Sequence, residues 1–375
     1  MKINNKKILF CDNTLWGLIT FRGAVIRKLV ELGYSITLVA PYKEDKQLQI
    51  KIPQGVKFIS IKMGRTSQNP FNDFCYFLKI LKIYKEEKPD YIFHYTIKPN
   101  IYGTIAATLL KIPNTAMLAG LGYIFQNDTL GCKIGRKIYR FGLAFCDHLF
   151  VLNQMNKELV IKRKMCSPEK IILLENGEGV DLKKYKYEDN TAEETTFLFI
   201  GRILKDKGYN EFVEAAIIIK EQFPNTHFEI LGALDPQYPN SISPEKFKRD
   251  QELGIFKYLG FTNDMQSVYK RKGIVITLPS YGEGMNRVLM EACATGKPII
   301  TTNIPGCKEM VSEGANGYLA KVKDAHSLIE AMRKYLELTK EQKNNFSKKS
   351  REIAEEKFDI KKIFLKYEDI ISSNI

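Results

Sequence analysis

The chain has 375 residues, which is too long for one ordinary core and suits two domains. Its 44% hydrophobic and 27% charged residues are globular values, and they exclude wholesale disorder. The longest mostly apolar run, residues 115–125, is far shorter than the roughly 18 residues that a membrane-spanning helix needs.

The N-terminus and the cysteines indicate the compartment. The N-terminus lacks the longer apolar stretch and the cleavage site of a secretory signal. The seven cysteines are scattered, odd in number and outside any CxxC or Cys/His cluster, so they predict neither disulfides nor a zinc site. We therefore expect a cytoplasmic protein.

The net charge of +14 lies entirely in the first half of the chain. Residues 1–188 hold 30 Lys and Arg against 16 Asp and Glu, whereas residues 189–375 hold 27 of each. Such a one-sided field indicates an anionic partner for the first half, either a phospholipid surface, a lipid diphosphate or a nucleic acid. The alternative is a solubility effect of a lysine-rich composition.

The first half alternates short apolar runs with helical patterns. Phe74, Phe77 and Leu78 recur at helical spacing and predict a helix over residues 74–84. Buried strands that alternate with helices predict a parallel sheet covered on both faces. The expected strands of this half are residues 7–11, 35–40, 57–61, 91–95, 115–118, 148–152 and 170–174.

The same pattern begins again after a charged segment, and it ends in a further helix over residues 360–371. The expected strands are residues 197–200, 227–231, 256–259, 274–278 and 298–302. We thus expect an N-terminal Rossmann-like domain for acceptor binding, a linker, a C-terminal Rossmann-like domain for nucleotide binding, and a terminal helix that packs back on the first domain. Their bounds are residues 1–181, 182–196, 197–358 and 359–375.

Ligands of open parallel sheets bind at the carboxyl ends of the strands. After the strand at residues 274–278, Glu283 precedes a helix that starts near residues 284–287, and Glu291 lies within that helix. The free amides of a helix start favour a diphosphate, and two carboxylates there accept hydrogen bonds from sugar hydroxyls. The alternative is that Glu283 complements the helix dipole and Glu291 is solvated.

A second polar loop follows the strand at residues 197–200. Arg202 and Lys207 lie between this strand and the next helix, where two cations can clamp a diphosphate. Taken alone, the pair is also compatible with a basic loop whose side chains are solvated. One loop that attracts anions and a neighbouring loop that offers carboxylates together favour a nucleotide-sugar site.

The pair Arg202 and Lys207, with two glutamates eight residues apart, resembles the signature of the retaining glycosyltransferases of group 1, also called family 4. The resemblance covers nearly the whole chain and implies the α/β GT-B fold, two Rossmann-like domains whose parallel sheets face a central cleft. It implies Glu283, Arg202 and Lys207 as catalytic residues. The nucleotide-sugar site that it implies comprises Gly17, Arg202, Lys207, Thr262, Glu283, Gly284, Met285, Asn286 and Glu291.

Two departures from the family pattern indicate a particular subgroup of the family. Many relatives carry a histidine near the reacting sugar where this chain has Ala119, and their donor loop commonly reads Glu-Gly-Phe-Gly where this chain has Met285 and Asn286. Both changes resemble the subgroup that builds bacterial capsules, O-antigens and N-glycans on a lipid diphosphate. The prediction that the nucleotide base is uracil rests on this resemblance.

A basic amphipathic segment, residues 131–143, predicts contact with the acceptor or the membrane. Ile134 and Ile138 fall on one side of the expected helix, as in an interfacial membrane helix or an ordinary surface helix. Because the acceptor would be a lipid, we expect the protein to be peripheral on the inner face of the cytoplasmic membrane. The residues expected to meet the acceptor or the membrane are Arg22, Lys133, Arg136, Lys137 and Arg140.

The sequence therefore predicts retaining transfer of an N-acetylhexosamine or hexose from a UDP-sugar to a polyprenyl-diphosphate-linked saccharide. No Asp-x-Asp or ligand cluster is present, so no metal and no other cofactor is expected. A nucleotide-sugar epimerase of the same architecture is the alternative enzyme. A nucleic-acid-binding protein is the non-enzymatic alternative, but the aromatic residues fall in core-like positions, and no nucleic acid partner is expected.

Overall fold

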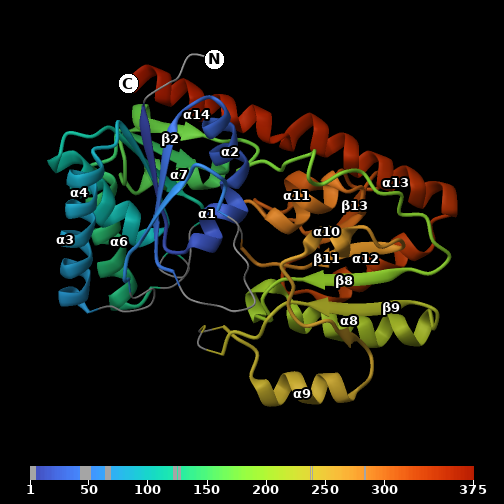
Figure 1. Cartoon of the computed structure of the whole chain (residues 1–375). Helices are drawn as coiled ribbons and strands as arrows, with labels where there is room; N and C mark the ends of the chain where they lie inside the picture. Colours follow the sequence, from blue (N-terminus) through green and yellow to red (C-terminus); the bar gives the residue numbers. More distant parts are fainter. Residues whose placement is uncertain are drawn as a thin grey trace. The chain divides into compact units, whose positions relative to one another are not determined.

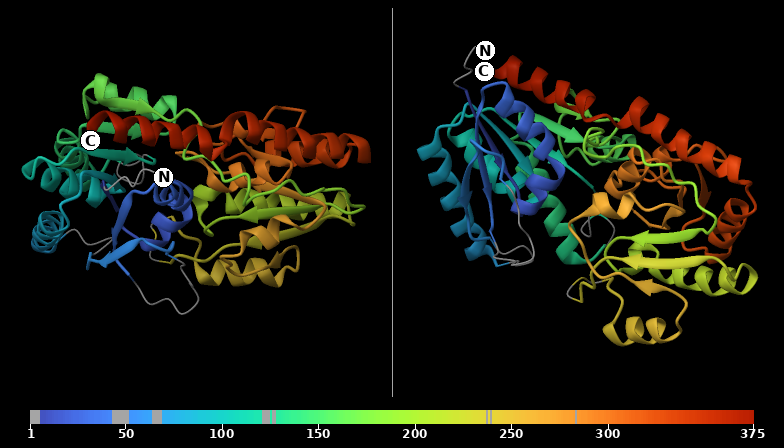
Figure 2. Two further views of the ribbon diagram at one scale, coloured as in Figure 1. Left: turned by 45° about the horizontal axis from the view of Figure 1, so that its top comes forward. Right: turned by 45° about the vertical axis from the view of Figure 1, so that its right-hand side comes forward.

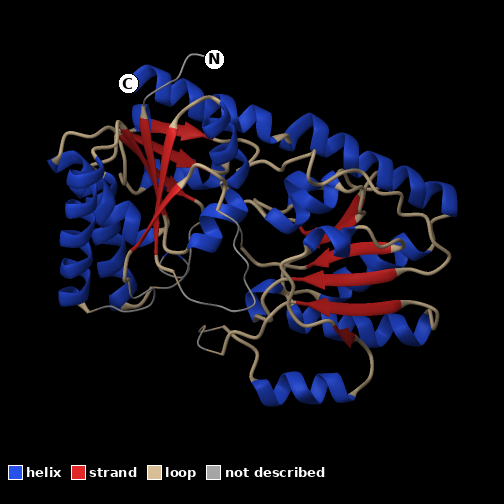
Figure 3. Ribbon diagram, viewed as in Figure 1, coloured by secondary structure: helices blue, strands red, loops and turns tan. Residues whose placement is uncertain are grey.

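The computed structural model describes residues 6–42, 52–63, 69–120, 125, 128–236, 238, 240–282 and 284–375. The chain forms two compact units (Figure 1). The first unit comprises residues 1–178 and 360–375, and the second comprises residues 179–359. Each unit contains one parallel β-sheet with helices packed against it, which is the α/β class that the sequence predicts (Figure 3).

The sheet of the first unit has seven parallel strands in the order β3-β2-β1-β4-β5-β6-β7. Most of the apolar runs predicted as strands are buried on both faces, as β4 and β5 are along their whole length, whereas β3 at the edge of the sheet is partly exposed. The strands are β1 (Lys7–Cys11), β2 (Ser35–Ala40), β3 (Lys57–Ser60), β4 (Tyr91–Tyr95), β5 (Asn114–Leu118), β6 (His148–Val151) and β7 (Ile171–Leu173).

Helices cover both faces of this sheet (Figure 2). One face carries α3, α4, α6 and α7, whose buried side chains form two apolar clusters with the strands. On the other, α2 contacts α1 and α14. The helical elements are α1 (Leu15–Phe21), α2 (Gly23–Glu31), α3 (Pro70–Glu87), η1 (Pro99–Gly103), α4 (Thr104–Leu109), α6 (Leu130–Leu143), α7 (Gln154–Lys162), η2 (Pro168–Lys170) and the terminal α14 (Ile360–Asn374).

The terminal helix α14 belongs to the first unit. The hydroxyls of Tyr367 and Tyr95 are 3.0 Å apart, and the Tyr367 ring lies 4.9 Å from the ring of Phe93 and 5.1 Å from that of Phe150. Aromatic pairs at such distances add to the free energy that burial already contributes. The apolar side of the terminal helix thus packs against aromatic side chains of the sheet.

His94 is an ionisable side chain in the core of the first unit, fully buried on β4. Its Nε2 lies 2.9 Å from the hydroxyl of Tyr84 on α3. Burial disfavours the imidazolium and lowers the pKa of His94 from 6.5 to about 3. The native unit therefore holds this ring neutral throughout the physiological pH range.

The neutral His94 predicts a loss of stability in mild acid. Below pH 6.5 the unfolded chain binds a proton that the native state excludes until about pH 3, so the free energy of unfolding falls by about 1.4 kcal/mol per pH unit from this group. Between pH 6.5 and 5 the wild type should lose about 2 kcal/mol more than His94→Gln, measured by denaturant titration at each pH. Equal pH slopes for the two proteins would contradict a neutral His94.

The second unit has a six-stranded parallel sheet in the order β10-β9-β8-β11-β12-β13. Its strands are β8 (Thr196–Ile200), β9 (His227–Leu231), β10 (Lys257–Tyr258), β11 (Ile274–Leu278), β12 (Ile299–Thr302) and β13 (Gly317–Ala320). Its helical elements are η3 (Lys205–Lys207), α8 (Tyr209–Gln222), α9 (Pro244–Glu252), α10 (Met265–Tyr269), α11 (Arg287–Ala294), η4 (Lys308–Met310), α12 (Ala325–Leu336), α13 (Lys340–Ile353) and η5 (Ala354–Phe358).

Residues 182–196, expected as a linker, fall inside the second unit. The side-chain amide of Asn190 donates to the Ile274 carbonyl at 2.9 Å, and its oxygen accepts from the Ile274 amide at 3.2 Å. The buried ammonium of Lys297 donates to the same oxygen at 3.0 Å, and burial lowers the pKa of Lys297 to about 8. This segment is thus bound along the edge where β11 begins.

Candidate active site

Two loops at the carboxyl edge of the second sheet carry the residues predicted to bind the donor. The first loop leaves β8 and passes through η3 into α8, and Gly208 at the start of α8 has φ +76°. A Cβ at Gly208 would collide with the carbonyl oxygen of Pro279 in the second loop, after β11. Glycine here permits both the left-handed turn and the close approach of the two loops.

Hydrogen bonds join these loops directly. The carbonyl of Asp206 accepts from the amide of Tyr281 at 2.8 Å and from the hydroxyl of Ser280 at 3.3 Å. Lys207 therefore directly follows Asp206, which these hydrogen bonds hold against the second loop. The structure thus brings the two polar loops together, although the bonded residues Asp206 and Ser280 are 74 positions apart in the sequence.

Arg202 has a half-exposed side chain at the end of β8. Its Nη1 lies 3.2 Å from a carboxylate oxygen of Asp235, and its guanidinium carbon lies 4.5 Å from the centre of the Tyr238 ring. Salt screens an exposed pair of this kind, so it holds the arginine weakly. Arg202 is therefore accessible to a phosphate without a large desolvation cost.

The second loop leads into the eight-residue helix α11. Asn286 caps this helix, because its side-chain oxygen accepts from the amide of Leu289 at 3.2 Å. Gly284 and Met285 come immediately before the cap, at the end of the helix where the partial positive charge of the dipole lies. Glu283, predicted to hold the donor sugar, lies outside the described residues.

Glu291 is 4% exposed on α11, so the alternative that it is solvated is wrong. One carboxylate oxygen lies 2.8 Å from Nε of Arg287, and Nη1 of that arginine donates to the Gly179 carbonyl at 2.7 Å. Burial and the negative charge of Glu291 raise the pKa of Tyr185 above its usual range. Arg287 thus supplies a positive charge beside this buried carboxylate.

Thr262 lies beyond β10 on the same edge of the sheet. Its hydroxyl accepts from the amide of Asp264 at 3.0 Å, which opens the turn into α10. The loop before it is bound to the end of β9, because the Gly232 amide donates to the Gly260 carbonyl at 2.8 Å. In the strand order, β10 lies two places from β8, so Thr262 and Arg202 share the carboxyl edge.

Gly17 lies in the first turn of α1, after β1 of the first unit. Its amide donates to the hydroxyl of Thr14 at 2.9 Å. A Cβ at Gly17 would lie 2.9 Å from that hydroxyl and 3.1 Å from Oδ2 of Asp12. The glycine is thus required by its own surroundings at the carboxyl edge of the first sheet.

Arg22 corrects an expectation, because its side chain is buried rather than presented to a membrane. It is 3% exposed, and its Nε and Nη1 lie 2.8 Å from Glu178 and 3.6 Å from Asp12. Its guanidinium carbon also lies 4.2 Å from the centre of the Tyr95 ring. A side chain enclosed by two carboxylates and an aromatic ring does not reach a lipid surface, and we assign it to the interior.

Asp12 and Glu178 are charged residues of this edge that the sequence analysis did not single out. Burial raises the pKa of Asp12 to about 6, although the neighbouring Arg22 opposes the shift. Among the residues that the structure describes, none donates a hydrogen bond to Oδ2 of Asp12, and Nη1 of Arg22 lies 3.6 Å from it. The available signals were the position of Asp12 directly after a strand and the two glycines, Gly177 and Gly179, that flank Glu178.

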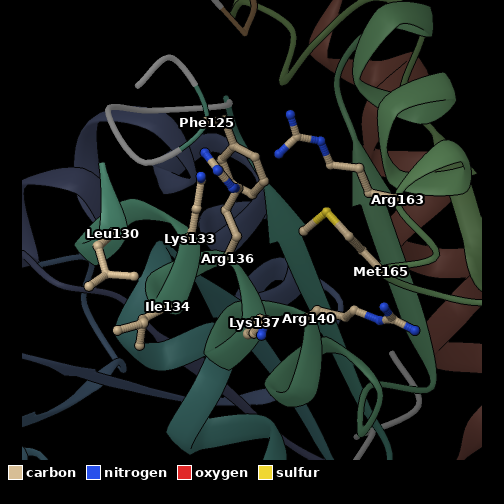
Figure 4. Close-up of a pocket in the computed structure, with 9 residues that line it drawn as sticks. All are labelled: Phe125, Leu130, Lys133, Ile134, Arg136, Lys137, Arg140, Arg163 and Met165. Carbon is tan, nitrogen blue, oxygen red and sulfur yellow. The ribbon is translucent and has the colours of Figure 1, made fainter. Parts of the chain in front are cut away.

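The helix α6 carries the predicted basic residues of the first unit (Figure 4). Lys133, Lys137 and Arg140 are exposed, whereas Arg136 pairs with Asp128 at 2.7 Å. The apolar residues on its outer surface are exposed instead of packed into the core. They are Leu130 (75%), Ile134 (51%), Ile138 (44%) and Phe141 (60%).

The described residues contain neither a candidate membrane span nor a candidate metal-binding cluster. Across the described part of the chain, no helix is long and apolar enough to cross a membrane. Among those same residues, no group of three or more His, Cys, Asp or Glu side chains is placed to hold a metal ion.

Comparison with known proteins agrees with these features. Residues 183–353 match the family model of glycosyl transferases group 1, and residues 7–153 match that of glycosyl transferase 4-like proteins. The N,N'-diacetylbacillosaminyl-diphospho-undecaprenol alpha-1,3-N-acetylgalactosaminyltransferase of Campylobacter jejuni is 28% identical over 84% of this chain and 86% of its own. The UDP-Gal:alpha-D-GlcNAc-diphosphoundecaprenol alpha-1,3-galactosyltransferase of Escherichia coli is 29% identical over 68% of each chain.

The fold is also that of a solved structure. HepE of Anabaena, determined in complex with UDP and glucose, superposes with a TM-score of 0.79 over 98% of this chain and 100% of its own. The two sequences are 18% identical, so the likeness is one of fold.

Proposed function

Because the chain belongs to the group 1 glycosyltransferases and has their GT-B fold, we propose that it moves a sugar from a UDP-sugar to a polyprenyl-diphosphate-linked saccharide. The observation that carries this proposal is the pair of hydrogen-bonded loops at the carboxyl edge of the second sheet. The C. jejuni and E. coli relatives are named as transferases acting on diphospho-undecaprenol sugars, which favours transfer over epimerisation.

The donor site of the proposal is built from the second unit. Arg202 and Lys207 bind the diphosphate, with the amides of Gly284, Met285 and Asn286 at the start of α11. Two more donor contacts are Thr262, whose backbone meets the base, and Glu291, which holds the ribose through the carboxylate that is paired with Arg287. Glu283 binds the transferred sugar.

Positive charge at the diphosphate is the catalytic device in this proposal. When the bond between sugar and phosphate breaks, negative charge develops on the leaving UDP, and fixed cations and amides lower the barrier. Retention requires the acceptor hydroxyl to attack from the face that UDP leaves. The departing phosphate oxygen takes the acceptor proton, since Ala119 supplies no polar group for this step.

The first unit binds the acceptor in this scheme, at the inner face of the cytoplasmic membrane. Exposed apolar residues and exposed cations on one helix match a lipid–water interface, where apolar side chains enter the acyl region and cations meet anionic head groups. α6 presents both kinds, for example Phe141 beside Arg140. Because α6 already packs on the core through Tyr139 and Leu143, these exposed apolar residues are additional to its core-facing side.

Metal independence is a direct consequence of this donor site. Since Arg202 and Lys207 balance the charge of the diphosphate, transfer should continue at an unchanged rate in excess EDTA. The measurement is the initial rate of UDP formation with and without chelator. Complete loss of activity that Mg²⁺ restores would contradict the assigned donor site.

Donor binding is tested without knowledge of the acceptor. A ligand that binds the native state raises the unfolding temperature according to its affinity and concentration. UDP and at least one UDP-sugar should stabilise the chain, and ADP and GDP should do so less. Equal stabilisation by all three diphosphates would show that the site does not select uracil.

A further inference from the structure

A concave surface of the first unit lies beside α6, and we call it the basic groove. It consists of two adjoining hollows of about 410 and 530 Å³ that share Lys137, Arg140 and Met165 (Figure 4). One wall is α6, and the other is the chain that follows α7. The cations that line it are Lys133, Arg136, Lys137 and Arg140 on α6, and Arg163, Lys164 and Lys170 on the opposite wall.

The charges of the basic groove are largely unbalanced. Lys170 donates to the Cys146 carbonyl at 2.9 Å, and the Arg163 guanidinium lies 5.6 Å from the centre of the Phe125 ring. Within the described part of the chain, six of these seven cations form no ion pair with a carboxylate, and the seventh, Arg136, pairs with Asp128 at 2.7 Å. Like charges gathered in this way repel one another, and a bound anion would relieve that repulsion.

Apolar side chains alternate with these cations. Phe125, Leu130 and Ile134 line one hollow, and Phe141 and Ala144 line the other. Leu130 and Phe141 are among the most exposed apolar residues described in this unit. The phosphate groups of a free phosphate or a nucleotide do not bind apolar side chains. A lipid with an anionic head group matches both the apolar side chains and the cations.

The position of the groove favours the acceptor over a bulk phospholipid. Phe125 lies in the segment that joins the carboxyl end of β5 to α6, and β5 is two places from β1, which leads to Gly17. From there the groove follows α6, where Leu130 to Arg140 spans about 15 Å. An acceptor whose sugar lies at the carboxyl edge needs such a path for its diphosphate and chain.

We propose that the basic groove binds the diphosphate and the first isoprenoid units of the lipid-linked acceptor. This inference rests on the proposed function. Arg163 and Lys164 hold the diphosphate from the wall opposite α6, and the apolar residues of α6 contact the chain. The acceptor is thereby held by its lipid part before its sugar reaches the donor.

The test uses farnesyl diphosphate as the probe and the full chain. Arg163→Gln with Lys164→Gln should weaken its binding on the order of 10-fold per lost cation, since each removes a charge-assisted contact. The matched control, Lys157→Gln with Lys162→Gln, removes two charges from α7 outside the groove and should bind normally. Calorimetric titration gives both dissociation constants, and UDP titrations of the same proteins should not change.

Two further binding measurements distinguish the possible ligands of the basic groove. Inorganic pyrophosphate should bind at least 10-fold more weakly than farnesyl diphosphate if the apolar wall takes part. Vesicles of phosphatidylglycerol should bind the groove variant and the control variant alike. Unchanged farnesyl diphosphate affinity in the groove variant, or a loss confined to vesicle binding, would overturn the inference. Absent UDP binding in the wild type would instead count against the proposed function.

Discussion

Replacing Arg22 by alanine should lower the free energy of unfolding by about 3–5 kcal/mol, because the change leaves the carboxylates of Asp12 and Glu178 buried without their cation. Arg22 is 3% exposed, so water does not replace the lost charge without local opening. The measurement is denaturant titration of the full chain at pH 7.5. This pH lies above the raised pKa of Asp12, so the carboxylate of Asp12 is ionised in the wild type.

Lys28→Ala is the matched control, since Lys28 lies on α2, the helix that Arg22 precedes, and has an exposed side chain paired to Glu31. It should change stability by less than about 0.5 kcal/mol. Part of the effect of Arg22→Ala should vanish below pH 5, where Asp12 binds a proton and one buried charge is removed. A variant as stable as the wild type would show that Arg22 is not enclosed as described.

Replacing Lys207 or Arg202 by alanine should reduce the rate of transfer by roughly 10- to 150-fold. Each change removes a charge-assisted contact to the donor diphosphate, worth about 1.5–3 kcal/mol. The loss should appear in kcat as well as in KM, because the negative charge on the leaving group grows in the transition state. Initial rates over a range of UDP-sugar concentrations give both constants.

Lys205→Ala serves as the control in the same loop, since Lys205 has an exposed side chain. Its rate should stay near that of the wild type. All three variants should remain folded, because the removed groups lie at the surface or at the loop. Near-wild-type turnover of both Lys207→Ala and Arg202→Ala would rule out this loop as the diphosphate site.

The strands of both sheets could be predicted from the sequence because they are continuous apolar runs bounded by polar turns. β1, β2, β4, β9 and β11 form over the predicted residues. The polar composition of residues 235–249 is typical of a surface loop, yet α9 begins within this segment at Pro244. Ser243 caps that helix and Pro244 occupies its first turn, a start signal that the polar composition of the segment concealed.

Long-range pairs account for what the sequence did not predict at the site. The approach of Gly208 to Pro279 and the enclosure of Arg22 each join segments far apart in the chain. The sequence around Arg22 gives no sign that two carboxylates surround its side chain. Arg163 and Lys164 were likewise missed, because their place opposite α6 follows from the packing of α7 and not from any local pattern.

The most direct test of the proposed function is a transfer assay with the full chain. A panel of UDP-sugars is incubated with and without a polyprenyl-diphosphate-linked saccharide, and UDP and lipid products are both quantified. The proposed function predicts that UDP release depends on the acceptor and that the lipid product is longer by one sugar. Conversion of a UDP-sugar to its epimer without acceptor, or no acceptor-dependent UDP release with any donor, would contradict it.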